Sequence, residues 1–245
     1  LSLKKYSDKL RIKFFASAFD LESLIFIMKH TKIIKVASSD NNNFIFLDKI
    51  LKHKKKCIIS TGLLNFKQIE ALVTSLKKKY SKHFLQNNLC LLHCISSYPA
   101  KDNDMNLNFI SQMQKRYKLP IGFSDHSIGI EAPIVAASLG AKVIEKHFTL
   151  DNNFSNFRDH KISLNPFDFK KMVQSIRRVE NMTGKDFKFS IKDELLNETT
   201  LRRTFYASRR IYKGEKFTLK NLVALRPKVK NSIDLDNIKK FLDKK

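Results

Sequence analysis

Apolar runs alternate along this chain with longer stretches whose apolar residues recur every three or four positions. The runs are not interrupted by regularly alternating polar residues, which is typical of strands buried on both faces of a parallel sheet. The predicted strands are Lys13–Phe19, Ile33–Ala37, Cys57–Ser60, Leu89–Cys94, Ile121–Phe123 and Lys142–His147. The longer stretches predict helices at Leu21–His30, Phe44–His53, Phe66–Tyr80, Leu107–Tyr117, Ile130–Leu139 and Pro166–Thr183.

Residue types with known preferences for helix ends stand at several of these boundaries. Asp20 precedes the first helix, where its carboxylate can accept a hydrogen bond from a free backbone N–H. Gly140 and Gly184 follow two helices, and Pro166 opens the last one, as expected of helix C- and N-termini. The pattern therefore predicts six βα units in series.

Serial βα units either close into a barrel, which takes eight of them, or form an open doubly wound sheet. No Gly-x-Gly-x-x-Gly motif follows any predicted strand, which weakens the dinucleotide-binding version of the open sheet. In a barrel, the functional residues lie at the C-terminal ends of the strands. Polar residues occur at that end of all six predicted strands, at Ser17, 35–38, 60–62, 93–98, 124–126 and 145–147. We therefore predict an α/β fold of the TIM barrel type with a polar ligand site at one mouth.

The pattern changes after Gly184. We predict a partial barrel domain over residues 1–185, a polar linker over 186–200 and a small β-rich module over 201–245. Two short strands are expected in this module, at Arg202–Ile211 and Lys213–Pro227, and the sequence Lys-Gly-Glu forms a turn between them.

A formal net charge of +24 on 245 residues suggests a nucleic-acid partner. However, the lysines are spread over the whole chain in short runs between apolar segments, such as 54–56 and 77–79. RNA-binding aromatic motifs, zinc-finger spacings and arginine-rich tails are missing from the sequence. We expect lysine-rich solvated helix faces and no nucleic-acid partner.

The three cysteines, Cys57, Cys90 and Cys94, lie inside apolar runs, where a free cysteine behaves as a small hydrophobic residue. An odd number of cysteines without repeated spacing indicates a reducing compartment and no disulfide framework. No apolar stretch approaches the ~20 residues of a membrane span. We expect a cytoplasmic protein with no membrane partner.

Five motifs, in their order along the chain, resemble the N-acetylneuraminate (sialic acid) synthase family. They are KVASSD (35–40), ISTGL (59–63), LLHCISSYP (91–99), GFSDHSIGIE (122–131) and VIEKHFTLD (143–151). RDHKISL (158–164) fits the same series. The segment IYKGEKFTLKNLVALRP (211–227), which follows an Arg-Arg pair, resembles the family's antifreeze-like (SAF) C-terminal domain. The resemblance implies a (β/α)8 barrel, with about six of its eight βα units present, followed by an incomplete SAF domain.

The family's first two strands, which carry a Glu, an Asn-His and a Lys, have no counterpart here, and the chain opens on Leu1. We therefore expect an N-terminally truncated member that forms an open, C-shaped barrel and is inactive alone. Adding the two missing N-terminal βα units is expected to restore a closed, active barrel.

The resemblance implies a reaction between phosphoenolpyruvate and N-acetylmannosamine or a related N-acylated aldose. The products are phosphate and a nine-carbon 2-keto acid of the sialic, legionaminic, pseudaminic or spore-coat type. It also implies a domain-swapped homodimer when the protein is full length. The alternatives are another phosphoenolpyruvate-dependent sugar-acid synthase and a non-catalytic or decayed barrel fragment.

By this resemblance, His126 and His147 match the family's metal-binding histidines. Two imidazoles with oxygen ligands suit Mn²⁺, although Mg²⁺, Co²⁺ and Zn²⁺ also fit, and such an ion can polarise an aldehyde. If the family resemblance is set aside, a lone histidine at a strand end is more often a hydrogen-bonded structural residue, and that is the alternative for both. Glu145 matches an acid close to the reacting carbon. Asp40 matches an acid near metal-bound water or the sugar, at a position where the family commonly has Glu. A salt bridge with a lysine is the alternative for Glu145.

The remaining matches are contacts to the substrates. Lys35 supplies a cation, and hydroxyl donors beside it suit a phosphate or carboxylate. Asp159 matches a sugar contact, and Arg226 matches an arginine that enters a neighbouring subunit's barrel. The alternative for each serine is an ordinary turn hydroxyl, and the alternative for Arg226 is a solvated surface residue. His93 is either packed or a substrate contact. The predicted phosphoenolpyruvate pocket comprises Lys35, Ser38, Ser17, Ser60, Ser96, Tyr98 and Ser124.

Overall fold

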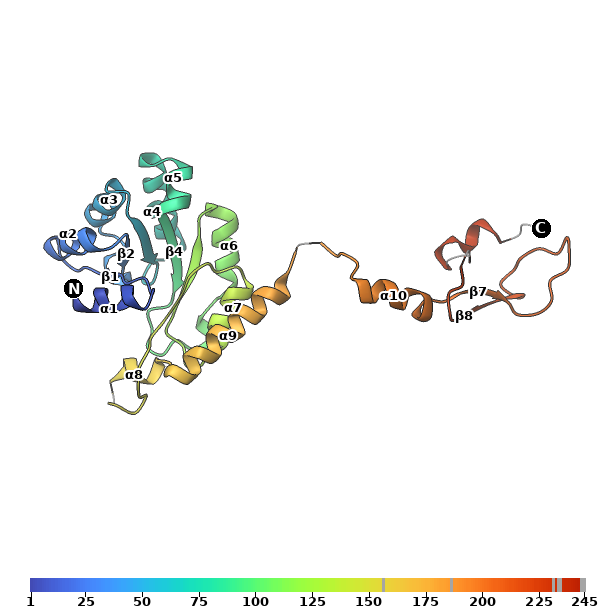
Figure 1. Ribbon diagram of the computed structural model, residues 1–245. Helices are drawn as coiled ribbons and strands as arrows, with labels where there is room; N and C mark the ends of the chain where they lie inside the picture. Colours follow the sequence, from blue (N-terminus) through green and yellow to red (C-terminus); the bar gives the residue numbers. More distant parts are fainter. Residues whose placement is uncertain (156, 186, 231, 233–234, 243–245) are drawn as a thin grey trace. The chain divides into compact units, whose positions relative to one another are not determined.

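The structure is a computed structural model, and it describes residues 1–155, 157–185, 187–230, 232 and 235–242. The chain divides into two compact units, Leu1–Gly184 and Lys185–Lys245 (Figure 1). None of the helices within the described residues is long and apolar enough to cross a lipid bilayer.

A single sheet of six strands forms the centre of the first unit. The strands are all parallel and lie side by side in chain order, as the sequence predicts. They are β1 (Ala16–Ser17), β2 (Ile33–Val36), β3 (Lys56–Ser60), β4 (Leu89–Cys94), β5 (Ile121–Asp125) and β6 (Ile144–Lys146). Among the described residues, β1 and β6 each pair on one side only, so the barrel is open.

A contact between β2 and β6 shows how strongly the sheet is curled. Lys35 on β2 and Glu145 on β6 form an ion pair at 3.6 Å. In a flat sheet, four strand spacings of about 4.8 Å would keep their backbones about 19 Å apart. The two side chains can meet only because the sheet bends into a half-barrel of the TIM type.

Helices cover the outer face of this sheet (Figure 1). The fully buried Ile34, Ile59, Leu91 and Ile121 point outward from successive strands and join one hydrophobic core with apolar residues of the helices. Residues between them on the strands face the barrel interior. The covering helices are α2 (Leu21–His30), α3 (Phe44–Lys52), α4 (Phe66–Lys79), α5 (Lys82–Asn88), α6 (Asn108–Tyr117), α7 (Glu131–Ser138) and α9 (Pro166–Thr183).

The ends of these helices follow local chemistry. The Asp20 side chain accepts a hydrogen bond from the Ser23 N–H at 2.7 Å, as the predicted cap requires. Gly140, just past α7, has a φ of +91°, a conformation that glycine adopts without strain. Asn65 and Gln68 form a reciprocal capping box at the start of α4.

Three short helices of the first unit were not predicted from the pattern. Besides α5, they are α1 (Ser2–Lys9) and α8 (Arg158–Ile162). α1 buries none of its residues, and α5 buries only Leu85, so neither helix contributes a row of buried apolar residues to the core. The predicted edge strands are also shorter in the structure, since β1 has two residues and β6 three.

The second unit contains α10 (Lys192–Leu201) and an antiparallel pair, β7 (Thr204–Ala207) and β8 (Leu222–Leu225), followed by a 3₁₀ helix at Leu235–Lys240. α10 occupies most of the stretch that the sequence predicted as a polar linker, and it buries none of its residues. A backbone hydrogen bond from Lys228 N–H to the Thr199 carbonyl, 2.7 Å long, ties this helix to the segment after β8.

Candidate active site

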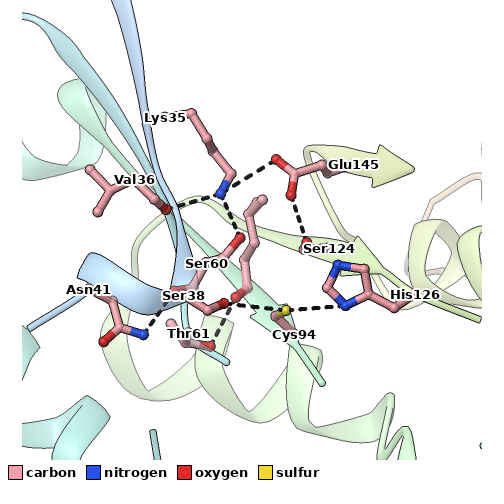
Figure 2. Close-up of polar contacts among 11 residues, drawn as sticks. Lys35, Val36, Ser38, Asn41, Ser60, Thr61, Cys94, Ser124, His126 and Glu145 are labelled. Carbon is pink, nitrogen blue, oxygen red and sulfur yellow. Dashed lines mark hydrogen bonds and ion pairs between the residues drawn. The ribbon is translucent and has the colours of Figure 1, made fainter. Parts of the chain in front are cut away.

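Six of the predicted side chains meet at the mouth formed by the C-terminal ends of the strands, and Figure 2 shows them: Lys35, Ser38, Ser60, Ser124, His126 and Glu145. Strand register explains why they share one face. Ser17 pairs with Lys35, and Ser124 pairs with both Cys94 and Glu145. Paired residues on neighbouring strands point to the same side of a sheet, and here that side is the barrel interior.

Lys35 forms the centre of this group. Its ammonium donates to Ser60 Oγ at 2.8 Å and to the Val36 carbonyl at 3.0 Å, and it lies 3.6 Å from Glu145 Oε2. Glu145 Oε1 in turn accepts a hydrogen bond from Ser124 Oγ at 2.7 Å. Lys35 is only 8% exposed. Four strands therefore contribute to one network around a buried cation.

Three small polar groups surround Gly62, which follows β3. A Cβ atom at this position would overlap Ser96 Oγ and would lie 2.6 Å from Ser38 Oγ and 3.1 Å from Cys94 Sγ. Ser96 Oγ is buried and has no hydrogen-bond partner among the described residues. A buried hydroxyl without a partner is uncommon in folded proteins, and it marks a position where a polar ligand atom can bind.

One buried side-chain amide connects two segments of this region. Asn41 is buried, and its side chain donates to the carbonyls of Ser60 at 3.1 Å and Gly62 at 2.8 Å. It therefore links the 3₁₀ turn at Ser38–Asp40 to the end of β3. The sequence analysis did not single out this residue, because a lone Asn after a strand is also an ordinary turn residue.

His126 and His147 face each other across the ends of β5 and β6. Their ring centroids are 5.3 Å apart, and the Tyr98 ring lies 4.1 Å from that of His126. His126 Nδ1 lies 2.8 Å from the carbonyl oxygen of Ile95. Because a carbonyl only accepts, Nδ1 donates this bond, and Nε2 of the neutral ring keeps its lone pair.

This arrangement fits a divalent metal ion. Metal-binding imidazoles usually donate their second nitrogen to a carbonyl or carboxylate, as His126 does to Ile95. An imidazole nitrogen lies about 2 Å from its metal, so two rings with centroids 5.3 Å apart can reach one ion. Within the described residues, no three His, Cys, Asp or Glu side chains form a group that could hold a metal. The histidines would therefore leave positions for oxygen ligands.

The electrostatics of the two rings differ. Burial and the charge of His126 lower the pKa of His147, against the opposing charges of Asp159 and Glu145. Burial also lowers the pKa of His126, but hydrogen bonds with the Cys94 thiol and the Ile95 carbonyl outweigh it and raise this pKa overall.

Cys94 was predicted as a packed hydrophobic residue, yet it contacts the site. Its Sγ lies 3.9 Å from His126 Nδ1 and accepts from Ser38 Oγ at 3.6 Å. Burial raises its pKa, but contacts with His126 and with Ser38 lower it overall. Burial raises the pKa values of Cys57 and Cys90 to about 12, so these two match the prediction. Only the position of Cys94 at a strand end distinguishes it in the sequence.

Not every predicted residue joins the group. The Asp40 carboxylate accepts a hydrogen bond from its neighbour Ser39 at 2.6 Å. Asp159, in α8, lies close enough to His147 for its charge to act on that ring. Arg226 is exposed in the second unit. His93 points toward the helices, where its Nε2 lies 2.6 Å from the Met105 carbonyl, so the packed alternative is correct.

The family is shown by a match of the NeuB family model to residues 1–188. The chain belongs to the NeuB family. A NeuB relative, the N,N'-diacetyllegionaminic acid synthase of Campylobacter jejuni, is 39% identical over 98% of this chain and 70% of its own length. The pseudaminic acid synthase of the same species is 36% identical over 87% of this chain and 60% of its own length. The family predicted from the motifs is thereby confirmed.

A solved structure of the same kind supports the fold. The sialic acid synthetase of Leptospira borgpetersenii, determined in complex with citrate, shares 36% identity and a TM-score of 0.73. The match covers 80% of this chain and 67% of that one. The chain thus spans 60% to 70% of the length of these relatives, and it is a member of a family of sugar-acid synthases.

Proposed function

We propose that this chain carries the catalytic barrel of a synthase that joins phosphoenolpyruvate to N-acetylmannosamine or a related N-acylated aldose. Water is the third reactant, and the products are phosphate and a sialic-acid-type nine-carbon 2-keto acid. The observation that carries the proposal is the buried Lys35 network beside the His126–His147 pair at one mouth. One half of the site suits an anion and the other suits a metal. We also propose a cytoplasmic reaction, in keeping with three free, buried cysteines.

Phosphoenolpyruvate has a phosphate and a carboxylate, and the Lys35 side of the mouth can bind such groups. A buried ammonium makes strong charge-assisted hydrogen bonds to anionic oxygens. The hydroxyl of Ser60 already accepts from it, and Ser38 and Ser96 offer hydroxyls around Gly62. Ser17 and Tyr98 complete the proposed pocket. An anion here would also give a hydrogen-bond partner to Ser96 Oγ, which has none in the part of the chain that the structure describes.

On the other side, His126 and His147 would hold the divalent metal, for which Mn²⁺ is the best candidate. This ion supplies Lewis-acid polarisation of the sugar aldehyde when bound. Glu145, oriented by Ser124 and Lys35, is placed to hold or deliver a proton near the reacting carbon. Asp159, beside His147, is proposed to contact a sugar hydroxyl. Asp40 is proposed as a second acid, acting from the turn after β2.

The second unit is proposed to be part of an antifreeze-like (SAF) domain. In a domain-swapped homodimer, its exposed Arg226 would reach the acyl group of the sugar in the neighbouring subunit. An arginine suits this role because its planar guanidinium can donate two parallel hydrogen bonds to a carbonyl or carboxylate.

Phosphate release tests the proposed reaction. The whole protein that carries this chain is incubated with Mn²⁺, phosphoenolpyruvate and either N-acetylmannosamine or a diacetylated amino hexose. We expect phosphate only when an N-acylated sugar is present, together with a 2-keto acid of matching mass. Mannose serves as the matched control, because it lacks the acylamino group. Sugar-independent release of phosphate, or release with mannose alone, would contradict the proposal.

Gly62→Ala tests the anion pocket. The added methyl group would overlap Ser96 Oγ and crowd Ser38 Oγ, so both hydroxyls must move by about 1 Å. Displacements of this size in an active site reduce rates by about 100-fold, and we expect that loss in kcat/KM for phosphoenolpyruvate. Ser96→Ala removes the hydroxyl without adding an atom and should lose less. Normal kinetics of Gly62→Ala would place the anion elsewhere.

A further inference from the structure

Directly behind the two histidines lies an ion pair that takes no part in the proposed chemistry. Lys146 Nζ lies 2.7 Å from Asp125 Oδ2, and both side chains are 0% exposed. The two residues are register partners on β6 and β5. Such a pair differs from the exposed ion pairs elsewhere on the chain, because neither charge has contact with water.

The position of the pair follows from strand alternation. Asp125 stands between Ser124 and His126, and Lys146 stands between Glu145 and His147. The flanking residues face the barrel interior, where Ser124 bonds to Glu145 and the two imidazoles meet. Asp125 and Lys146 therefore join the same two strands on the opposite face, one residue before each histidine.

Further hydrogen bonds extend the pair to the backbone that follows His126. Lys146 Nζ donates to the Ser127 carbonyl at 2.5 Å, and Asp125 Oδ1 accepts from the Ser127 N–H at 2.8 Å. The His126 carbonyl also accepts from Ala100 N–H at 3.0 Å. The chain is thus fixed on both sides of His126, and one of the anchors is the residue next to His147.

Stability alone does not account for a pair of this kind. Removing two charges from water is costly, and replacing a buried ion pair by apolar residues is often neutral or stabilising. What an apolar pair cannot reproduce is the pair of directional hydrogen bonds that ties β5 and β6 to the N–H and the carbonyl of Ser127, the residue after His126. The charges of this pair are therefore better explained by a geometric role.

We propose that Asp125 and Lys146 are positioning residues that fix the spacing of the His126 and His147 imidazoles. The pair sets the register of β5 and β6, and its bonds to Ser127 set the direction of the chain at His126. The inference rests on the proposed function in one respect, namely that the two rings serve a common metal ion. The spacing of the rings is itself measurable without any metal.

The test uses Lys146→Met, Asp125→Val and the double variant in the whole protein. Mn²⁺ binding is followed by electron paramagnetic resonance, and thermal unfolding gives Tm. Each single variant leaves a buried charge without its partner, so we expect a lower Tm and Mn²⁺ binding weaker by about 10-fold or more. In the double variant we expect Tm to recover while Mn²⁺ binding stays weak. Recovery of both would overturn the proposal, because charge compensation would then be the whole role.

Metal-free NMR separates this inference from the proposed function. In the wild-type protein, the ring protons of His126 and His147 are expected to give a mutual nuclear Overhauser effect, which the double variant loses. If the wild-type protein binds no Mn²⁺, the metal proposal fails, and only the ring contact tests the positioning proposal. Loss of the nuclear Overhauser effect in the double variant would support that proposal, and its retention there would overturn it. Glu70→Gln, which breaks the exposed pair with Arg116, is the matched control and should change neither readout.

Discussion

Replacing His126 and His147 together by alanine should reduce phosphate release to the background of the assay. The two rings face each other at 5.3 Å, and the His126 Nδ1 bond to Ile95 leaves Nε2 available for a metal. Under the proposed function, these two imidazoles would hold the metal ion, so removing both would also remove the polarisation of the sugar aldehyde that the ion would supply. A continuous assay of phosphate with phosphoenolpyruvate and an N-acylated mannosamine-type sugar measures the effect, and EDTA should reproduce it in the wild-type protein.

Two controls separate metal loss from unfolding. His126 is buried, and alanine there leaves a space, so a second double variant with glutamine keeps most of the side-chain volume. It should have a Tm near the wild-type value and remain inactive. His160 lies outside the pair and bonds to Thr149 Oγ1, so His160→Gln should keep most activity. Full turnover by the glutamine variant after chelation would show that the metal assignment is wrong.

The strands and helices of the barrel unit could be predicted because their pattern follows directly from burial. A parallel strand is apolar on both faces wherever helices and the barrel interior cover it, and Leu89–Cys94 was predicted with its observed bounds. The edge strand β1 was overestimated, because its length depends on pairing with Ile34 and Lys35 of β2. Which residues pair with a neighbouring strand depends on the tertiary structure, so the length of β1 cannot be predicted from the local run of apolar residues.

The α10 helix shows a second limit of sequence patterns. Its residues include good helix formers, yet its apolar residues do not gather on one side, so a polar linker was predicted. In the structure, the helix is held by Lys228, which bonds to the Thr199 carbonyl. A contact between residues this far apart in sequence cannot be read from local composition.

The sequence singled out residues of the candidate site that stand at strand ends, and it did not single out a residue whose surroundings depend on a distant partner. Lys35, Ser124 and Glu145 lie at the ends of parallel strands, which meet at one mouth in any barrel. Lys146 looks like any other basic residue in a sequence with 47 lysines and arginines. Only the structure shows that its side chain is buried and paired with Asp125.

Lys35→Met should weaken the use of phosphoenolpyruvate without destabilising the fold. The ammonium is the buried cation of the mouth, and its proposed ligand is an anion. A hydrogen bond to a charged group contributes about 1.5–3 kcal/mol, which corresponds to a factor of roughly 10 to 150 in affinity. We therefore expect the KM for phosphoenolpyruvate to rise by about that factor, while the KM for the sugar changes little.

The stability of this variant distinguishes binding from a structural role. Methionine fills a similar volume and does not require the desolvation of a charge, and the carboxylate of Glu145 is 38% exposed, so water can solvate it. Tm should therefore stay unchanged or rise slightly. Lys79→Met, which removes a surface partner of Asp48, is the matched control and should leave KM unchanged. A Lys35→Met variant that unfolds several degrees earlier yet binds phosphoenolpyruvate normally would make this lysine a structural residue.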